Sequence, residues 1–446
     1  MSKRKEPRRW EIVVSVKVEQ SAESYVCNLK APYKSELTGR MAMKVLFVTW
    51  DGPQVSYLEG LFLPIFERLQ AAGLEFHVLQ FTWGDPKGLA RARSACERAG
   101  IPYRPVSVWR RPVGFGSLLT ALAGGRLIRK LARSWAIDVV MPRSNLPALA
   151  TLCALRKQAF PVVFDADGLP LDERVDFAGA SPSGLVYRLL RDVEAEMVRR
   201  SNTVLTRSTK AAEILLARAG ARTAPDNFKV VGNGRDASKF APGTAAERSG
   251  TRRELGFYDD SPVLVYAGSL GEQYCMNEML ALFAAIKRRR ADAKLLILSG
   301  TPDVARAALA GNPSLAADSS IRSVSPDEVP RYLACADLGL ALRRPSFSMQ
   351  AVAPIKVGEY LLCGLPVVAT KGIGDTDVLG SEVAFLLEKM DATELECAAE
   401  WFCTNVFPAR ATSRDDCRSV GLQYFSLDAS KAAYLSAFDR LRLSET

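Results

Sequence analysis

The chain has 446 residues, of which 48% are hydrophobic and 24% are charged, so its composition is that of a globular protein and excludes intrinsic disorder, collagen-like repeats and a disulfide-stapled miniature. At about 150 residues per domain, this length predicts two or three domains, and the lack of any run of about 18 apolar residues excludes a spanning helix. The 59 basic and 49 acidic residues give a net charge of +10, which suits an anionic partner such as nucleic acid, a phosphorylated ligand or an acidic membrane face.

Residues 1–42 differ in composition from the rest of the chain. Five of the first nine residues are basic, and no hydrophobic stretch follows them, so the segment is not a secretory signal. We expect it to be either a disordered tail or the product of a start codon chosen too far upstream, with Met41 or Met43 as the natural start.

From residue 43 onward, short β-rich runs alternate with helical periods, which predicts parallel strands joined by crossover helices. In the first half of the chain we expect strands near residues 43–50, 75–82, 137–141, 161–165, 203–206 and 228–231. We expect helices near residues 58–72, 86–99, 117–134, 147–158, 184–200 and 208–219. The strands are continuous apolar runs, as in sheets that are covered on both faces.

The second half of the chain repeats this alternation after residues 240–250, whose composition predicts a linker. The expected strands lie near 262–268, 293–299, 321–324, 337–342, 365–370 and 383–388. The expected helices lie near 276–290, 302–310, 326–335, 355–363, 392–403 and 429–442. We infer two doubly wound α/β domains of similar size, divided near residue 230. Ligands of such sheets bind at the carboxyl ends of the strands, so two facing domains predict a shared cleft.

Cysteine and histidine usage limits the chemistry. Nine scattered cysteines without a CxxC pair predict reduced thiols in a cytosolic protein. The single histidine, His77, lies in the apolar run 74–79, and we interpret it as a satisfied strand histidine rather than a catalytic base or a metal ligand.

The most informative segment is residues 354–370. Pro354 suits the first turn of a helix, and Lys356 lies in that turn beside free N–H groups that attract phosphate. Glu359 follows at i+3 and faces the same way, and Gly364 ends the helix before a buried strand. This pattern predicts a site for a diphosphate with a carboxylate for a sugar diol. A helix with a plain i,i+3 ion pair explains the local pattern equally well.

This segment resembles the donor-site signature of retaining GT-B glycosyltransferases (glycosyltransferase group 1, family 4-like) of the branch that builds bacterial surface polysaccharides. Further segments resemble that family in the same order along the chain, over about residues 43–442. They are residues 164–174 (D-x-x-G…D-E-R), 231–240 (N-G-x-D…F), 264–270, 328–340, 372–377 and 424–434. Each motif alone is weak, and their ordered set is specific.

The resemblance implies an α/β protein with the GT-B fold, in which two doubly wound Rossmann-like domains face a central cleft. It implies an acceptor-binding domain at 43–228, a donor-binding domain at 229–415 and a helix within 416–446 that crosses back, after the extension that composition predicts at residues 1–42. The implied activity is a hexosyltransferase-like, metal-independent transfer of a sugar from a nucleotide-diphosphate sugar to a saccharide or lipid-linked acceptor. Retention of the anomeric configuration, the absence of a cofactor and a role in polysaccharide or glycolipid biosynthesis are implied by the family.

The resemblance also implies roles for individual residues. Glu359 would bind the ribose hydroxyls of the nucleotide, and Lys356 would hold the diphosphate. The implied donor-binding residues are Gly268, Ser269, Asn233, Gly234, Lys356 and Glu359. The implied acceptor-side residues are Asp51, Gly52, Ser56, Asp167 and Gly168. The implied catalytic residues are Asp167, Lys356 and Glu359.

This chain departs from the family pattern at two places. Many relatives carry a second glutamate eight residues before Glu359, where this chain has Ala351. Relatives often place an arginine and a lysine after the first strand of the second domain, where this chain has Ser269 and Tyr274. Lost cations weaken the charge stabilisation of a leaving diphosphate. The cations that could compensate are Lys356, Arg343 and Arg344.

A basic stretch at residues 104–143 holds eight basic residues against one acidic residue, interleaved with aromatic and leucine side chains. This basic amphipathic pattern suits an anionic membrane surface, and it also fits a core-packed helix with a solvated basic face. No stacking or groove-reading motif accompanies the charge, so we expect no nucleic-acid partner. The sequence predicts a cytoplasmic protein, and the basic stretch adds the hypothesis of docking to the inner face of the cell membrane.

Three alternatives stay open beside glycosyl transfer. The missing glutamate and arginine fit a non-catalytic nucleotide-sugar binder or assembly partner, and a nucleotide-sugar epimerase shares the GT-B architecture. A dinucleotide-dependent oxidoreductase ranks low because no GxGxxG follows a strand at the expected places. Asp165-Ala-Asp167 is formally a DxD motif that could bind Mg²⁺. By analogy with the fold, we favour the interpretation that this motif binds no metal ion.

Overall fold

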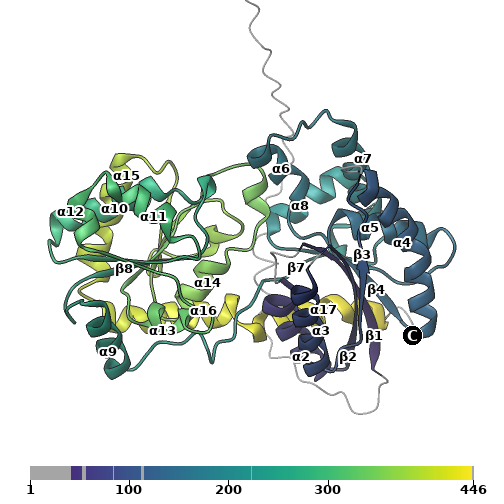
Figure 1. Cartoon of the computed structure of the whole chain (residues 1–446), viewed down its shortest axis with the longest axis horizontal. Coiled ribbons are helices and arrows are strands. Elements are labelled where there is room, and N and C mark those ends of the chain that lie inside the picture. Colours follow the sequence, from purple (N-terminus) through teal and green to yellow (C-terminus); the bar gives the residue numbers. More distant parts are fainter. Residues whose placement is uncertain (1–41, 53–56, 84, 112–114, 222, 444–446) are drawn as a thin grey trace, which may run out of the picture. The chain divides into compact units, whose positions relative to one another are not determined.

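The computed structural model describes residues 42–52, 57–83, 85–111, 115–221 and 223–443, and this part of the chain forms two α/β domains with parallel sheets (Figure 1). The predicted fold class is therefore confirmed. The extension at residues 1–42 lies, up to residue 41, outside the described residues.

The first domain contains two parallel sheets that meet at two isolated bridges, the second of which joins Arg143 to Asp165. One has the strand order β3-β2-β1-β4 and the other β5-β6-β7, and Val140 bridges to Val162 between them. The strands are β1 (Met43–Asp51), β2 (Leu74–Thr82), β3 (Tyr103–Ser107), β4 (Val139–Pro142), β5 (Val163–Asp165), β6 (Thr203–Thr206) and β7 (Phe228–Val230). β3 is an edge strand that the hydrophobic pattern did not predict.

Helices cover both faces of the first sheet because its strands are apolar on both sides. Val45 and Phe47 of β1 pack into one core cluster, and Leu46 and Val48 pack into another. The helical segments are η1 (Leu58–Phe62), α2 (Leu63–Gln70), α3 (Pro86–Arg98), α4 (Phe115–Ser134), α5 (Asn145–Leu155), α6 (Pro170–Ala178), α7 (Leu185–Arg200), α8 (Thr209–Ala219) and η2 (Pro225–Asn227).

The second domain has one parallel sheet with the strand order β10-β9-β8-β11-β12-β13. Its strands are β8 (Val263–Ala267), β9 (Lys294–Leu298), β10 (Ser319–Arg322), β11 (Leu338–Ala341), β12 (Val367–Thr370) and β13 (Ala384–Leu387). Its helical segments include η3 (Glu272–Tyr274), α10 (Met276–Arg289), α11 (Pro302–Ala310), α12 (Pro313–Ala317), α13 (Val329–Ala334), η4 (Ser348–Ala351), α14 (Ile355–Leu362), η5 (Thr376–Val378), α15 (Ala392–Trp401) and η6 (Phe402–Val406). The strand order changes direction between β8 and β11, which is where doubly wound sheets bind ligands.

The predicted linker at residues 240–250 is wrong in its second half, because α9 (Ala245–Leu255) begins there. Thr244 and Glu247 form a reciprocal capping box, in which each side chain accepts from the other residue's backbone N–H. The Thr244-x-x-Glu247 spacing, which indicates the start of a helix, was present in the sequence. The prediction of a linker instead followed the glycine- and serine-rich composition of the segment.

The last two helices connect the two domains. α16 (Arg410–Phe425) packs against α14 so closely that a Cβ on Gly421 would lie 2.7 Å from the Leu362 backbone nitrogen. α17 (Leu427–Leu443), coloured yellow, then packs on the first domain (Figure 1), where Tyr434 and Phe438 are fully buried in the same cluster as β1.

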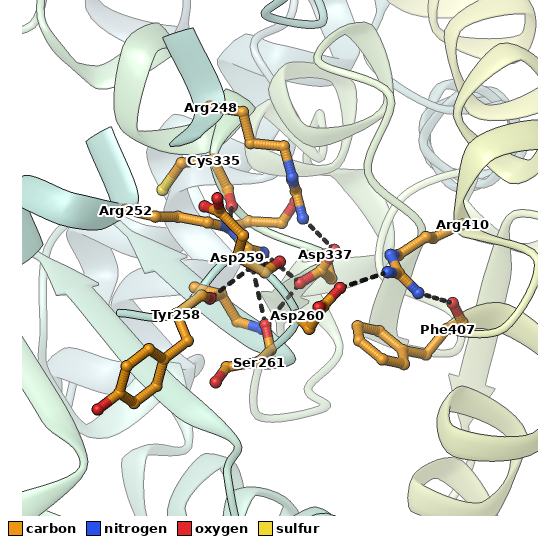
Figure 2. Close-up of polar contacts among 12 residues, drawn as sticks. Arg248, Arg252, Tyr258, Asp259, Asp260, Ser261, Cys335, Asp337, Phe407 and Arg410 are labelled. Carbon is orange, nitrogen blue, oxygen red and sulfur yellow. Dashed lines mark hydrogen bonds and ion pairs between the residues drawn. The ribbon is translucent and has the colours of Figure 1, made fainter. Parts of the chain in front are cut away.

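A buried charge network fixes α9 to the start of β11 (Figure 2). The Asp337 carboxylate accepts from Arg252 Nη2 at 2.6 Å and from the Val263 backbone N–H at 2.9 Å, and it also pairs with Arg248. The Arg252 side chain is only 1% exposed and also donates to the backbone carbonyl oxygens of Tyr258, Asp259, Ser261 and Cys335. Asp337 is therefore the anion that neutralises a buried guanidinium group.

His77 lies in β2 as predicted, with its ring 5.2 Å from that of Trp135. Its Nδ1 atom is buried and has no hydrogen-bond partner among the described residues, so the histidine is packed rather than satisfied. Burial lowers the pKa of its imidazole. Of the helices in the described ranges, none is both long and apolar enough to span a membrane.

Candidate donor and acceptor sites

Lys356 occupies the first turn of α14, as the sequence predicts, and its ammonium group lies against aromatic side chains. Its Nζ atom lies 4.0 Å from the ring centroid of Tyr274 and 4.4 Å from that of Tyr266, and it donates to the Tyr266 hydroxyl at 2.8 Å. We call Tyr266, Gly268, Tyr274 and Lys356 the lysine corner. Burial, aided by the positive charge of Arg343, lowers the pKa of Lys356 to about 7. This half-buried ammonium group is therefore partly shielded from water.

Gly268 ends β8 and makes room for the lysine. Its φ of +140° favours glycine, and a Cβ at this position would lie 2.4 Å from Cε of Lys356. The backbone carbonyl of Ser269 accepts from the Tyr266 hydroxyl. The predicted diphosphate residues Gly268, Ser269 and Lys356 thus meet at the carboxyl end of β8.

Glu359 lies one turn after Lys356 and is 8% exposed. Its Oε1 atom pairs with Arg235 Nη2 at 2.8 Å, so within the described chain the partner of Glu359 is Arg235 rather than Lys356. The plain i,i+3 ion pair is therefore not what the structure contains. Burial raises the pKa of the Glu359 carboxyl, and the Arg235 charge opposes that shift.

Asn233 and Gly234 immediately precede Arg235. Oδ1 of Asn233 is buried without a hydrogen-bond partner among the described residues, so it is an acceptor still available to a ligand. Gly234 instead packs on the last helices. Its backbone N–H donates to Ser430 Oγ at 2.8 Å, and a Cβ there would lie 2.2 Å from the Ser426 carbonyl oxygen.

Charged side chains gather at the carboxyl ends of β4, β5 and β6 in the first domain. Both Asp165 oxygens accept from Arg207 Nη2 at 2.7 Å, and Arg143 Nη1 donates to Asp165 at 3.0 Å. All three residues are almost completely buried. Burial alone would raise the pKa of Asp165, yet the two guanidinium groups hold it below its usual range.

Asp167 follows this network and also pairs with Arg143. Its φ of +56° is unusual for a residue with a side chain, and burial raises the pKa of its carboxyl. The next residue, Gly168, abuts the donor-side segment η4, because a Cβ on Gly168 would lie 2.8 Å from the Ala351 carbonyl oxygen. The predicted acceptor residue Gly168, which follows Asp167, therefore lies beside Ala351.

The other predicted acceptor residues follow β1. Asp51 ends the strand and accepts from Thr49 Oγ1 at 2.7 Å and from Gln80 Nε2 at 3.3 Å. Gly52 abuts Trp83, whose ring would lie 2.7 Å from a Cβ at that position. Ser56 lies outside the described residues.

Sequence reasoning missed Arg235 and Tyr266 as members of these sites. Arg235 is the unspecified residue of the N-G-x-D motif, and Tyr266 lies in an apolar strand run. The sequence pattern therefore predicted no binding role for either residue. The motif position of Arg235, directly after Asn233 and Gly234, was a usable signal for it.

The fold is shared with solved glycosyltransferase structures. A glycosyltransferase from Rickettsia africae ESF-5 has a TM-score of 0.70 at 14% identity, over 90% of this chain and 99% of that chain. Anabaena Alr3699/HepE, solved with UDP-glucose, has a TM-score of 0.62 at 18% identity, over 89% of this chain and 100% of that chain. WaaG, a glycosyltransferase involved in lipopolysaccharide biosynthesis, has a TM-score of 0.58 at 15% identity, over 88% of this chain and 98% of that chain. At these identities the likeness defines the class of fold, which is GT-B.

The sequence families agree with that class. Residues 62–234 match the glycosyl transferase 4-like domain, and residues 261–405 match the glycosyl transferases group 1 family. Two separate parts of the chain are therefore similar to glycosyltransferase domains, and the chain has the GT-B fold. A search of curated proteins found no match to this chain.

Proposed function

We propose that this protein transfers a sugar from a nucleotide-diphosphate sugar to a saccharide or lipid-linked acceptor, with retention of configuration, in polysaccharide or glycolipid biosynthesis. The observation that carries the proposal is Lys356, a half-buried cation at the carboxyl end of β8 without an acidic ion-pair partner among the described residues. Two similar structures support the donor class and the pathway, since HepE was solved with UDP-glucose and WaaG is involved in lipopolysaccharide biosynthesis.

In the proposed reaction the bond between the sugar and the diphosphate breaks, and a bond forms between the sugar and a hydroxyl oxygen of the acceptor. Negative charge grows on the leaving diphosphate, which takes up the proton of that hydroxyl group. Lys356, fixed by Tyr266 and Tyr274, would stabilise that charge without reorganising. Glu359, oriented by Arg235, would accept hydrogen bonds from the ribose hydroxyls. Asp167 would lie beside the sugar or its acceptor.

The proposed reaction proceeds without a metal ion bound through Asp165 and Asp167. The Asp165 carboxylate already accepts from both Arg143 and Arg207, and ligating a cation would break these charge-assisted bonds. In the described residues, no group of three or more His, Cys, Asp or Glu side chains is placed to hold a metal ion.

A second candidate function is that of a non-catalytic nucleotide-sugar binder. Ala351 favours it, because this residue takes the place of the family's first glutamate and is fully buried in the first-domain cluster that contains Phe164. Tight donor binding without donor hydrolysis or transfer to any acceptor would support this candidate over the enzyme.

The donor site can be tested with a Glu359→Gln variant. The change removes the ion pair with Arg235 and weakens a charged acceptor, so we expect the donor KM to rise about tenfold, which corresponds to about 1.4 kcal/mol. The donor is first identified by a thermal-shift screen of UDP-, GDP-, ADP- and dTDP-sugars, because a ligand of the native state raises the Tm. Glu213→Gln, which alters an exposed pair with Lys210, is the matched control. An unchanged KM in Glu359→Gln would place the ribose elsewhere.

We further propose that the first domain docks on an anionic membrane through α4. Phe115, Leu119 and Leu122 are spaced along one face of the helix and are 59%, 37% and 49% exposed. The same face continues with the exposed residues Arg126, Lys130 and Arg133. We call these six residues the α4 stripe. Apolar side chains that enter the lipid boundary beside basic side chains suit anionic headgroups.

Binding to vesicles tests the α4 stripe. We expect the protein to float with phosphatidylglycerol-containing vesicles and not with pure phosphatidylcholine vesicles. The double variant Leu119→Glu and Leu122→Glu should lose this binding, whereas Val304→Glu, at an exposed position of α11, should keep it. Equal binding to both vesicle types, or to neither, contradicts the proposal.

A further inference from the structure

Arg343 is a second cation beside the lysine corner. It lies just past the carboxyl end of β11, where the Thr370 hydroxyl oxygen accepts from its backbone N–H at 2.9 Å. Its guanidinium Cζ lies 5.1 Å from the ring centroid of Tyr274, and its Nη2 donates to the Tyr274 hydroxyl at 3.3 Å. One tyrosine therefore positions both Arg343 and Lys356.

Among the residues that the structure describes, no anion neutralises these two cations. In the described part of the chain, neither Arg343 nor Lys356 has an acidic side chain within ion-pair distance. Glu359, the carboxylate whose field favours the charged form of Lys356, is already paired with Arg235. Like charges held together and partly out of water raise the free energy of the empty site, and a bound anion lowers it.

The place of the two cations in the sheet points to the same kind of ligand. β8 and β11 are hydrogen-bonded neighbours, and they lie where the strand order changes direction. Lys356 reaches the end of β8 at Gly268, and Arg343 follows the end of β11. A guanidinium group also offers paired N–H donors that match phosphate oxygens.

We propose that Arg343 is the second cation that binds the donor diphosphate, together with Lys356, and that it replaces the cations absent at Ser269 and Tyr274. The Tyr274 ring contacts the charged groups of both Arg343 and Lys356 and so sets their positions. This inference rests on the proposed function and names a residue of the same site. Arg344 does not share this role, because its side chain is exposed and its backbone N–H donates to the Gln273 carbonyl oxygen.

The test uses inorganic pyrophosphate and UDP as probes, with the full-length protein in an isothermal titration calorimeter. With pyrophosphate, diphosphate binding can be measured before the base and the sugar of the donor are known. We expect Arg343→Gln to weaken pyrophosphate binding at least tenfold and to reduce its salt dependence, since one ion contact is lost. Arg344→Gln, the neighbouring arginine, should change the affinity less than twofold. Arg343→Lys, which keeps the charge, should bind several times more tightly than Arg343→Gln.

The outcomes separate this inference from the proposed function. If Lys356→Met loses pyrophosphate while Arg343→Gln binds like the wild type, the diphosphate site stands and the role of Arg343 is wrong. If Arg343→Lys binds pyrophosphate no better than Arg343→Gln, the positive charge at this position does not contribute to binding. The inference is then overturned, even if Arg343→Gln is poorly folded. If the wild type binds neither pyrophosphate nor any nucleoside diphosphate, the proposed function fails as well.

Discussion

Replacing Lys356 with methionine is expected to lower kcat/KM about 30-fold to about 1,000-fold, which corresponds to about 2–4 kcal/mol of lost transition-state stabilisation. The methionine fills nearly the same space against Tyr266 and Tyr274 but cannot neutralise the leaving diphosphate. The measurement is sugar transfer from the donor found in the screen, in parallel with the Tm of each variant. The Tm should not fall, because the variant removes a charge that the folded protein holds out of water.

The lowered pKa of Lys356 gives this prediction a pH dependence. Below pH 7 the side chain is protonated in the free protein, and the donor meets a cation. Above pH 7 the free lysine loses its proton, and binding must restore it, so donor affinity should fall by up to tenfold per pH unit. A nucleotide sugar suits this experiment because the sugar esterifies the terminal phosphate, which removes the ligand's own titration in this range. Lys356→Met should abolish the pH dependence.

Lys239→Met serves as the matched control because Lys239 is exposed and pairs with Asp327 at 3.4 Å. It should retain activity and the pH profile of the wild type. Full activity in Lys356→Met, or a pH profile that this variant leaves intact, would place the diphosphate outside the lysine corner.

The second large effect concerns stability. Asp337→Ala is expected to lower the free energy of unfolding by about 3–5 kcal/mol, because it leaves the buried Arg252 guanidinium without its anion. The backbone N–H of Val263 loses its side-chain acceptor at the same time. Urea unfolding followed by circular dichroism should show the midpoint of the second domain at a clearly lower urea concentration.

Figure 2 also contains the control for this experiment. Asp260 pairs with Arg410 at 3.4 Å, but its side chain is 95% exposed. Asp260→Ala should therefore shift the free energy of unfolding by less than about 1 kcal/mol. Equal effects of the two substitutions would mean that the buried network does not support this domain.

The sequence predicted the alternation of strands and helices well because buried parallel strands are long apolar runs between turn residues. It missed β3, since Pro105 interrupts that segment and its residues are only partly buried at the sheet edge. It also missed α16, whose residues are mostly polar and of which only Cys417 and Gly421 are buried. Edge strands and surface helices carry weak hydrophobic signals, so composition alone does not reveal them.

Residue spacing alone predicted which side chains lie together only within one local segment, whereas the grouping of Gly268 and Ser269 with Lys356 was implied by the family resemblance. Lys356 and Glu359 are three residues apart on one helix, and the sequence placed both. Their partners Arg235 and Tyr274 come from other segments of the chain, and the sequence gives no distance between such segments. The pairing of Asp165 with Arg143 and Arg207 likewise depends on side chains from three neighbouring strands.

The position of α17 links the two ends of the described chain. Phe438 of this helix lies edge-on to Phe76 of β2, at a centroid distance of 6.3 Å, so a helix that follows the second domain in the chain completes the core around the strands of the first domain. The N-terminal lobe therefore stays unfinished on the ribosome while the whole second lobe is being translated. A polypeptide released before residue 427 would expose the apolar surface of the first domain that α17 covers in the full chain.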